Sequence, residues 1–297
     1  MNPDRERKKK LWFIINPKSG HGMNKKLFRL IGKTFPESHF EFEIKMTERS
    51  RHAVGISEEA VKNLSDAVIV AGGDGTINEA AQPLRNTPVA LGIIPSGSGN
   101  GFANYFKIPH DVRSALEVVR TGKTKTIDSI TVNNRFCINL AGTGFDAYIA
   151  FLFSKKKKRG FTTYIKLVIQ KYFGYDERVY RIELNGTLLD RRALLISLAN
   201  GNQFGNGAKI APHALADDGL MDVVIMKKNS WWNIPMVINS LFADRFIADS
   251  FAELHQTRSV IISGSEPMYL HLDGEPEGPF EKIEAQIHPM TNKIIVP

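Results

Sequence analysis

The stretch that most constrains this chain is residues 67–80, which read AVIVAGGDGTINEA. The five apolar residues at its start predict a buried strand. Three glycines within the next four residues predict a loop whose backbone can adopt positive φ and lie close to a ligand. Thr76 and Glu79 match the capping-box pattern, so we expect a helix to begin there.

A strand, a glycine loop and a helix N-terminus in this order favour phosphate binding, because unpaired N–H groups and the helix dipole point at the anion. The loop is not a Walker A motif, since the Gly-Lys-Ser/Thr ending is missing and Asp74 stands where that motif has a lysine. A carboxylate beside phosphates is favourable when a cation lies between them. Taken alone, the stretch also fits a tight turn between a strand and a capped helix.

Two further glycine-rich loops follow predicted strands. The strand 11–15 leads into the loop 16–22, and the strand 89–94 leads into the loop 95–101. The other predicted elements here are a strand at 40–44 and helices at 24–31, at 53–64, from about 102, and at 111–120. This alternation predicts a doubly wound α/β domain with a parallel sheet. Because the carboxyl ends of such strands form the ligand crevice, the three loops should meet at one edge.

After Lys125 the pattern changes to short strands separated by turn signals. We therefore expect residues 1–125 to form a nucleotide-binding α/β domain and residues 126–297 a mostly antiparallel β-sandwich or open barrel, with the last strands free to return to the first domain. The expected strands are 127–132, 136–140, 179–184, 193–199, 221–226, 260–263, 268–272 and 283–288, the expected turns are Asn133-Asn134, Asn185-Gly186 and Asp273-Gly274, and the expected helices are 147–172 and 231–246.

The net charge and the cysteine content limit the kinds of partner and the compartment that suit this chain. A formal net charge of +8 favours an anionic partner, namely a nucleotide, a nucleic acid or an acidic membrane surface. We find no base-stacking or groove-reading module, and therefore expect no nucleic acid. The single cysteine, Cys137, excludes an internal disulfide, fits a reducing cytoplasm and lies in an apolar run that predicts burial. No apolar run reaches the roughly 18 residues of a transmembrane helix.

Residues 16–20, 72–79 and 95–103 together carry a specific resemblance. In this order and spacing, and over nearly the whole chain, they resemble the diacylglycerol kinase catalytic-domain family, which includes bacterial soluble lipid kinases and sphingosine kinases. The central motif alone also resembles those of NAD kinases and phosphofructokinases. The resemblance implies a fold like that of NAD kinase and diacylglycerol kinase, and an ATP-dependent lipid kinase, a transferase of phospholipid biosynthesis.

The acceptor lipid is less constrained than the kinase chemistry. Many bacterial members of the family have an aspartate where this chain has Gly101, whereas the sphingosine-kinase-like form has a small residue there. The resemblance implies transfer to a membrane lipid such as diacylglycerol, giving phosphatidic acid, with a sphingoid base or another lipid alcohol as the alternative. Two other hypotheses are a soluble-substrate kinase of the NAD kinase type and a non-catalytic protein that binds lipid in response to nucleotide.

By match to the family, the nucleotide contacts are expected at Asn16, Thr47, Gly72, Gly73, Asp74, Gly75, Thr76, Glu79 and Ser98. The residues themselves add Ser19, because its hydroxyl can donate to a phosphate oxygen or contact the ribose. Without such donors a bound triphosphate would leave several charges unpaired, at a cost of several kcal/mol each.

The segment His271-Leu272-Asp273-Gly274-Glu275-Pro276 predicts a strand end and a tight turn with two carboxylates around a glycine. The local sequence is equally typical of a solvated hairpin turn. In similar proteins the glutamate accepts a proton, so the resemblance implies that Glu275 is the catalytic base for the lipid hydroxyl. Asp273 and Asp74 are candidate supporting or metal-linked carboxylates of the same active site, which we expect in a cleft between the domains.

Residues 213–222 contain an Asp-Asp-Gly turn before a predicted strand. A hard cation takes carboxylate and carbonyl oxygens, and a turn of this shape can supply both. In similar proteins the turn holds Mg²⁺, so the resemblance implies a metal site made by the carboxylate of Asp218 and the carbonyls of Leu215 and Leu220. The alternative is a simple Asp-Gly turn.

Five successive cations, residues 155–159, lie between aromatic segments at 151–153 and 161–173. They suit an anionic leaflet, at about 1 kcal/mol per Lys or Arg near the surface. The alternative is a solvated loop followed by a core helix. Trp231 and Trp232 fit packing and lipid contact equally. We expect a cytoplasmic enzyme, peripheral to the inner leaflet of the cell membrane, and allow for a homodimer.

Overall fold

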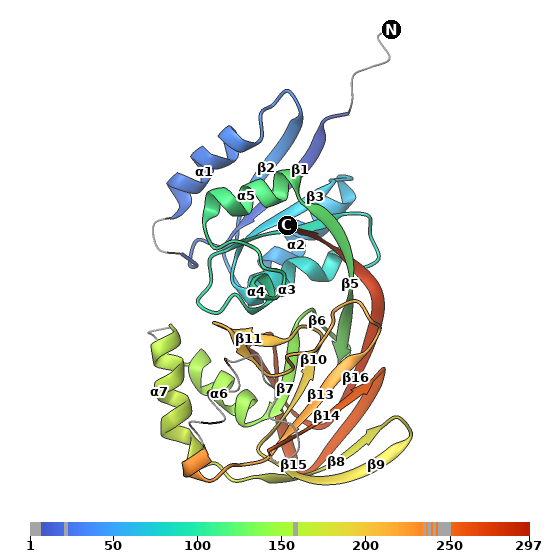
Figure 1. Cartoon of the computed structure of the whole chain (residues 1–297). Helices are drawn as coiled ribbons and strands as arrows, with labels where there is room; N and C mark the ends of the chain where they lie inside the picture. Colours follow the sequence, from blue (N-terminus) through green and yellow to red (C-terminus); the bar gives the residue numbers. More distant parts are fainter. Residues whose placement is uncertain are drawn as a thin grey trace. The chain divides into compact units, whose positions relative to one another are not determined.

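The computed structural model of the protein describes residues 7–20, 23–156, 160–233, 236, 239, 242 and 251–297 (Figure 1). The chain divides into two compact units, Met1–Ile127 with Thr291–Pro297, and Asp128–Met290. The division thus follows Ile127 rather than residue 125, and the last residues of the chain join the first unit.

The first unit is built on a parallel sheet, as predicted. Strands β1 (Lys9–Ile15), β2 (Phe40–Met46), β3 (Ala67–Gly72) and β4 (Ala90–Pro95) lie in the order β4-β3-β1-β2. The end of β16 (Glu275–Val296) adds a parallel partner to β4, where Lys293 and Ile294 pair with Ala90 and Leu91. Every residue of β3 and β4 is buried, which explains why both strands are continuous apolar runs rather than alternating ones.

Helices connect these strands. They are α1 (Met23–Thr34), α2 (His52–Lys62), α3 (Asp74–Ala81), α4 (Gly101–Tyr105) and α5 (Val112–Thr121), with the short 3-10 helix η1 (Gln82–Leu84). The helix predicted at 111–120 is confirmed as α5, and its side chains Val112, Ala115, Leu116 and Val119 are buried. This helix begins where the carboxylate of Asp111 accepts the N–H of Ser114 at 2.9 Å.

The capping box predicted for α3 is wrong. The helix begins at Asp74, directly after Gly73, and no side chain caps its first turn. Thr76 and Glu79 therefore lie inside the helix. Each side chain bonds to a different loop instead, Thr76 to Asn16 and Glu79 to Arg51.

The second unit is mostly antiparallel, as predicted. Its strands lie in the order β14-β13-β10-β7-β15-β16, with β8 beside β15, β9 beside β8, β5 beside β16 and β6 beside β5. The bounds are β5 (Lys123–Val132), β6 (Arg135–Cys137), β7 (Leu140–Gly144), β8 (Arg178–Leu184), β9 (Thr187–Ala193), β10 (Leu195–Ala199), β13 (Met221–Met226), β14 (Ala252–Thr257) and β15 (Ser259–Leu272), with a small separate sheet of β11 (Gln203–Gly205) and β12 (Ala208–Lys209). Apolar side chains such as Ile182, Ile196 and Ile262 form its core.

The three predicted turns are confirmed as two-residue hairpin turns. Their central residues all have positive φ: Asn133 (47°) and Asn134 (61°), Asn185 (52°) and Gly186 (74°), Asp273 (48°) and Gly274 (85°). Positive φ at both central positions is the mark of a type I′ turn, whose twist matches that of the flanking strands.

Two helices, α6 (Phe145–Ser154) and α7 (Phe161–Tyr172), replace the single helix expected over 147–172. Gly160, with a φ of 136°, precedes α7 and breaks the helical path. The α6 helix packs against α7, β7 and β15 (Figure 1). The helix expected over 231–246 lies largely outside the described residues, which include the 3-10 helix η2 (Trp231–Asn233). Over the part of the chain that the structure describes, no helix is both long and apolar enough to cross a bilayer.

Candidate functional site

Three loops meet at the carboxyl edge of the parallel sheet in the first unit, as the strand order predicts. Asn16 follows β1, Gly73 follows β3 and Ser96 follows β4. The Nδ2 of Asn16 donates to Oγ1 of Thr76 at 2.9 Å, and the hydroxyl oxygens of Ser19 and Ser96 are hydrogen-bonded at 2.9 Å. The first loop is therefore linked by side chains to both of the others.

The second and third loops approach each other through glycine backbone. A Cβ atom added to Gly97 would lie 2.5 Å from the Cα of Gly73, and one added to Gly73 would lie 3.1 Å from the Cα of Gly97. Asn100 fixes this arrangement, because it accepts the N–H of Gly97 at 2.8 Å and donates to the carbonyl of Gly97 at 2.9 Å. There is no room for a side chain at position 97, so this part of the site is formed by backbone atoms.

Asp74 ties the second loop to the third. Its carboxylate accepts the N–H groups of Gly101 and Phe102, each at 3.1 Å. Burial raises the pKa of Asp74 above its ordinary value, and these N–H groups partly offset the increase. Asp74 thus has a structural task in addition to the catalytic one expected from the sequence.

Glu79 organises the loop that follows β2. Its Oε1 accepts the N–H of Arg51 at 2.7 Å, and Arg51 has a positive φ of 61°. Thr47, at the start of that loop, is buried, and its N–H donates to the carbonyl of Ile15 at 2.9 Å. Glu79 therefore shapes a fourth loop at the same edge of the sheet.

The residues expected to contact the nucleotide all lie in these loops, at the end of β3 or in α3. Ser98, the outermost of them, is exposed in the third loop. The structure adds Ser96 and Asn100, which the sequence analysis did not single out. The sequence could have indicated both residues, because they belong to the third glycine loop.

The predicted base, Glu275, is the first residue of β16 and is exposed. Within the described residues, no hydrogen bond or ion pair holds its carboxylate. Asp273 differs, because its carboxylate accepts the N–H groups of Leu140 at 2.8 Å and Ile138 at 3.3 Å. Asp273 therefore holds the turn in place, whereas the exposed carboxylate of Glu275 takes no part in fixing it.

Cys137 is buried beside Asp273, as its apolar neighbours predict. Its Sγ donates to the Asp273 carboxylate at 3.5 Å. Burial, followed by the charge of Asp273, raises the pKa of the Cys137 thiol well above its usual range. The thiol is therefore structural and unreactive.

Asp128, which the sequence analysis missed, organises the predicted metal loop. It is fully buried, and its two oxygens accept the N–H groups of Gly219 at 2.7 Å and Met290 at 2.8 Å. The loop itself is closed by Asp218, whose Oδ1 accepts the N–H of Leu220 at 2.9 Å. A lone aspartate within a predicted strand carries no local signal of such a role.

The charge around this loop fits a bound cation. Burial and then the charges of Asp218 and Asp217 raise the pKa of Asp128, and burial and then Asp218 raise the pKa of Asp222 to about 6. No three His, Cys, Asp or Glu side chains come together as a metal site in the described ranges. The metal site expected from the sequence, one carboxylate with main-chain oxygens, stays a prediction.

The aromatic residues on either side of the basic run belong to α6 and α7. The Nζ of Lys155 is 3.8 Å from the centroid of the Phe151 ring, and Phe153 packs edge to face with Tyr164 at 5.6 Å. Side chains on one side of these helices belong to a core cluster of the second unit. For that side, the alternative prediction of a helix packed in the core is therefore correct. Residues 157–159 of the basic run lie outside the described residues.

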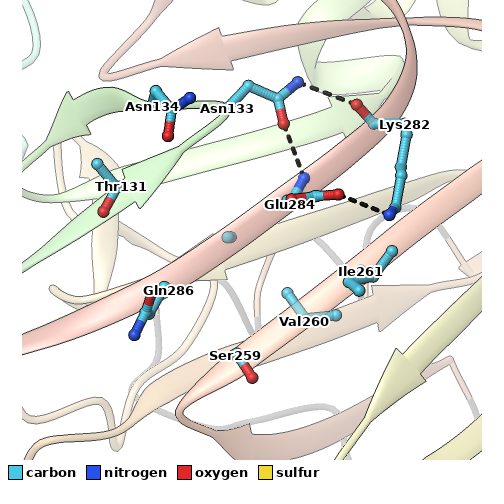
Figure 2. A pocket seen from close by; sticks show the side chains of 10 residues that line it. Thr131, Asn133, Asn134, Ser259, Val260, Ile261, Lys282, Glu284 and Gln286 are labelled. Atoms are coloured by element: carbon cyan, nitrogen blue, oxygen red, sulfur yellow. Dashed lines mark hydrogen bonds and ion pairs between the residues drawn. The ribbon is translucent and has the colours of Figure 1, made fainter.

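A hollow of about 450 Å³ lies in the second unit, between the β5–β6 turn and strands β15 and β16. Figure 2 shows the side chains that line it. None of the predicted site residues lines it. Its polar groups bond to one another: Asn133 donates to the carbonyl of Lys282 and accepts the N–H of Glu284, and the Lys282 and Glu284 side chains form an ion pair at 2.6 Å. The charged side chains that line this hollow are thus already paired.

Two family models match the chain. The diacylglycerol kinase catalytic domain matches residues 10–132, and the YegS C-terminal NAD kinase beta sandwich-like domain matches residues 139–296. A diacylglycerol kinase of Bacillus subtilis (strain 168) is 31% identical over 276 residues, which cover 91% of each chain. A probable lipid kinase, YegS-like, of Shewanella frigidimarina (strain NCIMB 400) is 29% identical over 268 residues, covering 88% of this chain and 86% of the relative.

Solved structures share the fold. A crystal structure of a putative diacylglycerol kinase from Bacillus anthracis str. Sterne superposes with a TM-score of 0.80 at 21% identity and covers 99% of both chains. The fold is therefore found in an experimentally determined structure.

Proposed function

Because the chain belongs to the diacylglycerol kinase catalytic-domain family, it is a lipid kinase with ATP as co-substrate, and we propose that its acceptor is the hydroxyl of diacylglycerol. The lipid oxygen attacks the γ-phosphorus, and the bond from that phosphorus to the β-phosphate oxygen breaks. ADP leaves, the hydroxyl proton passes to a base, and the product is phosphatidic acid.

The observation that carries the proposal is the meeting of the glycine loops at one edge of the sheet. Gly73 and Gly97 bring the backbones of the second and third loops into close contact, and α3 begins directly after Gly73, so its first N–H groups face the same loop. The hydroxyl of Ser19 lies in the first loop, and the hydroxyl of Thr76 lies in the first turns of α3, where it accepts the Nδ2–H of Asn16. Phosphoryl transfer depends mainly on positioning and charge stabilisation, which such a site supplies.

Glu275 is the proposed proton acceptor. Its exposed carboxylate lies directly after a turn that Asp273 anchors to the backbone of Leu140 and Ile138. A base with no competing partner can accept the proton of an incoming hydroxyl, a contribution of about 10²–10⁴-fold.

Mg²⁺ is the proposed cofactor. Asp218, with the carbonyls of Leu215 and Leu220, would hold it in the loop before β13, where it would neutralise carboxylates that repel one another. After burial, the charge of Asp218 also raises the pKa values of Asp128 and Asp222, and this concentration of negative charge supports a cation there.

A panel of acceptors tests the proposal. The protein is incubated with γ-labelled ATP, Mg²⁺ and mixed micelles of diacylglycerol, sphingosine or monoacylglycerol, and with NAD in solution. We expect labelled phosphatidic acid as the main product. Label in the sphingosine product would reassign the acceptor. Label in NADP alone, or ATP-dependent vesicle binding with no labelled lipid, would contradict the proposal.

We further propose that the enzyme takes its lipid at an anionic membrane surface, at the inner leaflet of the cell membrane. Ile169 and Phe173, on and just after α7, are 55% and 62% exposed, and Trp232 in η2 is 70% exposed. The two segments adjoin, because the Tyr172 hydroxyl donates to the carbonyl of Asn229 and accepts its N–H, both at 2.9 Å. Exposed apolar side chains gathered in this way suit the headgroup region of a bilayer.

Cations accompany these apolar side chains. Lys166 and Lys171 belong to α7, and the Nζ of Lys228 donates to the carbonyl of Phe173 at 3.3 Å. Each cation near an anionic leaflet adds about 1 kcal/mol of attraction. The combined surface supports docking on acidic rather than neutral lipid.

Changing Ile169 and Phe173 together to serine is expected to weaken binding to phosphatidylglycerol vesicles by about 30-fold, since the exposed parts of the two side chains are worth about 2 kcal/mol on burial. Vesicle sedimentation measures this binding, with phosphatidylcholine vesicles for comparison. The matched control changes Val179 and Leu188 to serine. These residues are 48% and 58% exposed on the β8–β9 hairpin, at the opposite side of the second unit from α7 (Figure 1). Equal losses in the two double variants would contradict docking through α7.

A further inference from the structure

Asp146 and His271 form a buried pair in the second unit. Asp146 lies in the first turn of α6 and His271 near the end of β15, and they are 7% and 3% exposed. The Nε2 of His271 is 3.1 Å from Oδ2 of Asp146, and the other carboxylate oxygen accepts the N–H of Ala147 at 2.7 Å. Buried polar groups of this kind are stable only with their partners in place, so the pair fixes its own geometry.

The hydrogen bond at the second ring nitrogen of His271 identifies the tautomer of the imidazole. The N–H of Gly274 donates to Nδ1 at 3.4 Å, so Nδ1 is an acceptor and the ring proton lies on Nε2. That proton is donated to Asp146. A continuous set of hydrogen bonds thus runs from Gly274 through the imidazole to the start of α6.

The sheet leaves space for the pair at Gly142. In the register of β7 and β15, Gly142 lies opposite His271. A Cβ atom on Gly142 would clash with Oδ2 of Asp146 and lie 2.9 Å from Nε2 of His271. A side chain at this position would therefore separate the two residues.

The turn that follows is held from two directions. Asp273 and Gly274 have φ values of 48° and 85°, and Leu272 pairs with Glu275 across the turn. The carboxylate of Asp273 bonds to backbone before and in β7, whereas the N–H of Gly274 bonds to His271. Glu275 is the next residue, so the orientation of its backbone depends on both anchors.

We propose that Asp146 and His271 are positioning residues for Glu275. The inference rests on the proposed function, because it takes Glu275 as the proton acceptor of that reaction. Neither side chain is exposed enough to exchange a proton with a lipid. Their effect passes through Gly274, which the imidazole holds in the conformation that presents Glu275.

Kinetics of the full chain test the first consequence. His271→Leu and Asp146→Leu are each expected to lower kcat by about 100-fold, the loss typical of a misplaced reacting group, with the KM for ATP unchanged. The double variant should lose no more than either single one, because the pair acts as a unit. His271→Asn, which retains an acceptor for the N–H of Gly274, should recover part of kcat.

His255→Leu is the matched control. His255, on β14, also lies beside a carboxylate, with its Nε2 3.6 Å from Glu253, but it has no link to the turn. Its substitution should leave kcat unchanged. A kcat for folded His271→Leu equal to that of His255→Leu would overturn the inference, as would fully additive losses in the double variant.

A second measurement is independent of activity. Nitrogen NMR of the imidazole should show a protonated Nε2 and an unprotonated Nδ1 for His271, and Asp146→Leu should shift the backbone amide signal of Gly274. A protonated Nδ1, or an unmoved Gly274 amide, would overturn the inference even in an active enzyme. If the parent phosphorylates no lipid, the proposed function fails, and these signals still decide whether the pair holds the turn.

Discussion

Changing Glu275 to glutamine is expected to lower kcat by about 10²–10⁴-fold, because the side chain keeps its size and loses the group that accepts the lipid proton. Glu275 is exposed, and its carboxylate has no hydrogen bond or ion pair with the rest of the described chain. The KM for ATP and the melting temperature should therefore stay at the values of the parent. Steady-state kinetics with labelled ATP and diacylglycerol, with a thermal melt, measure all three.

Glu281→Gln provides the control for charge. Glu281 is exposed on the same strand, so its substitution removes one carboxylate from β16 without touching the turn. Its kcat should equal that of the parent. If Glu275→Gln and Glu281→Gln turn over at the same rate, Glu275 is not the base and the reaction must use another proton acceptor.

The second large effect is expected for Gly97→Ala. The added methyl carbon would lie 2.5 Å from the Cα of Gly73 and 2.9 Å from Oδ1 of Asn100, so the second and third loops must separate. Nucleotide affinity should fall by at least about 100-fold, the equivalent of two charge-assisted hydrogen bonds. The overpacking should also cost about 1–3 kcal/mol of the free energy of unfolding. Calorimetric titration with ATP and urea unfolding measure the two quantities.

Gly32→Ala shows what the same substitution does without crowding. Gly32 lies in α1, and no heavy atom lies within 4 Å of its added Cβ. The variant should bind ATP like the parent and gain about 0.5–1 kcal/mol of stability from a better helix former. Unaltered ATP affinity in folded Gly97→Ala would show that the close contact of the two loops is not needed for the nucleotide.

The elements that the sequence predicted well are those whose signal is local. Continuous apolar runs identified β1, β3 and β4, because strands buried on both faces need no alternation. Asn-Asn, Asn-Gly and Asp-Gly identified three hairpin turns, because these residues tolerate positive φ. The grouping of the glycine loops followed from parallel strand order alone.

The sequence did not predict contacts between residues that lie far apart along the chain. Thr76 and Glu79 have the spacing of a capping box, yet their partners are Asn16 and Arg51, which belong to other loops. Local spacing contains no information on those contacts. Asp128 and the Asp146–His271 pair were missed for the same reason, since each acts through residues brought close by the sheet.

Among the elements that the sequence analysis missed, strands β9 and β14 and the break between α6 and α7 have weak signals of their own. The strand β14 reads AELHQT and β9 reads TLLDRRA, so neither has a sustained apolar face or run. Their place in the sheet comes from pairing with β13 and β8. Phe145–Ser154 and Phe161–Tyr172 both contain many apolar residues, and the marks of the break between them are Gly160 and the basic run that follows Ser154.

The parallel pairing of β16 with β4 has a consequence for biosynthesis. The outer edge of β4 acquires its partners, Lys293 and Ile294, only after the whole second unit has been translated. Until then the nascent first unit carries an open sheet edge, and such edges pair readily with other chains. A fragment that stops at Ile127 would keep that edge open permanently, so the first unit cannot be moved between proteins as one contiguous piece.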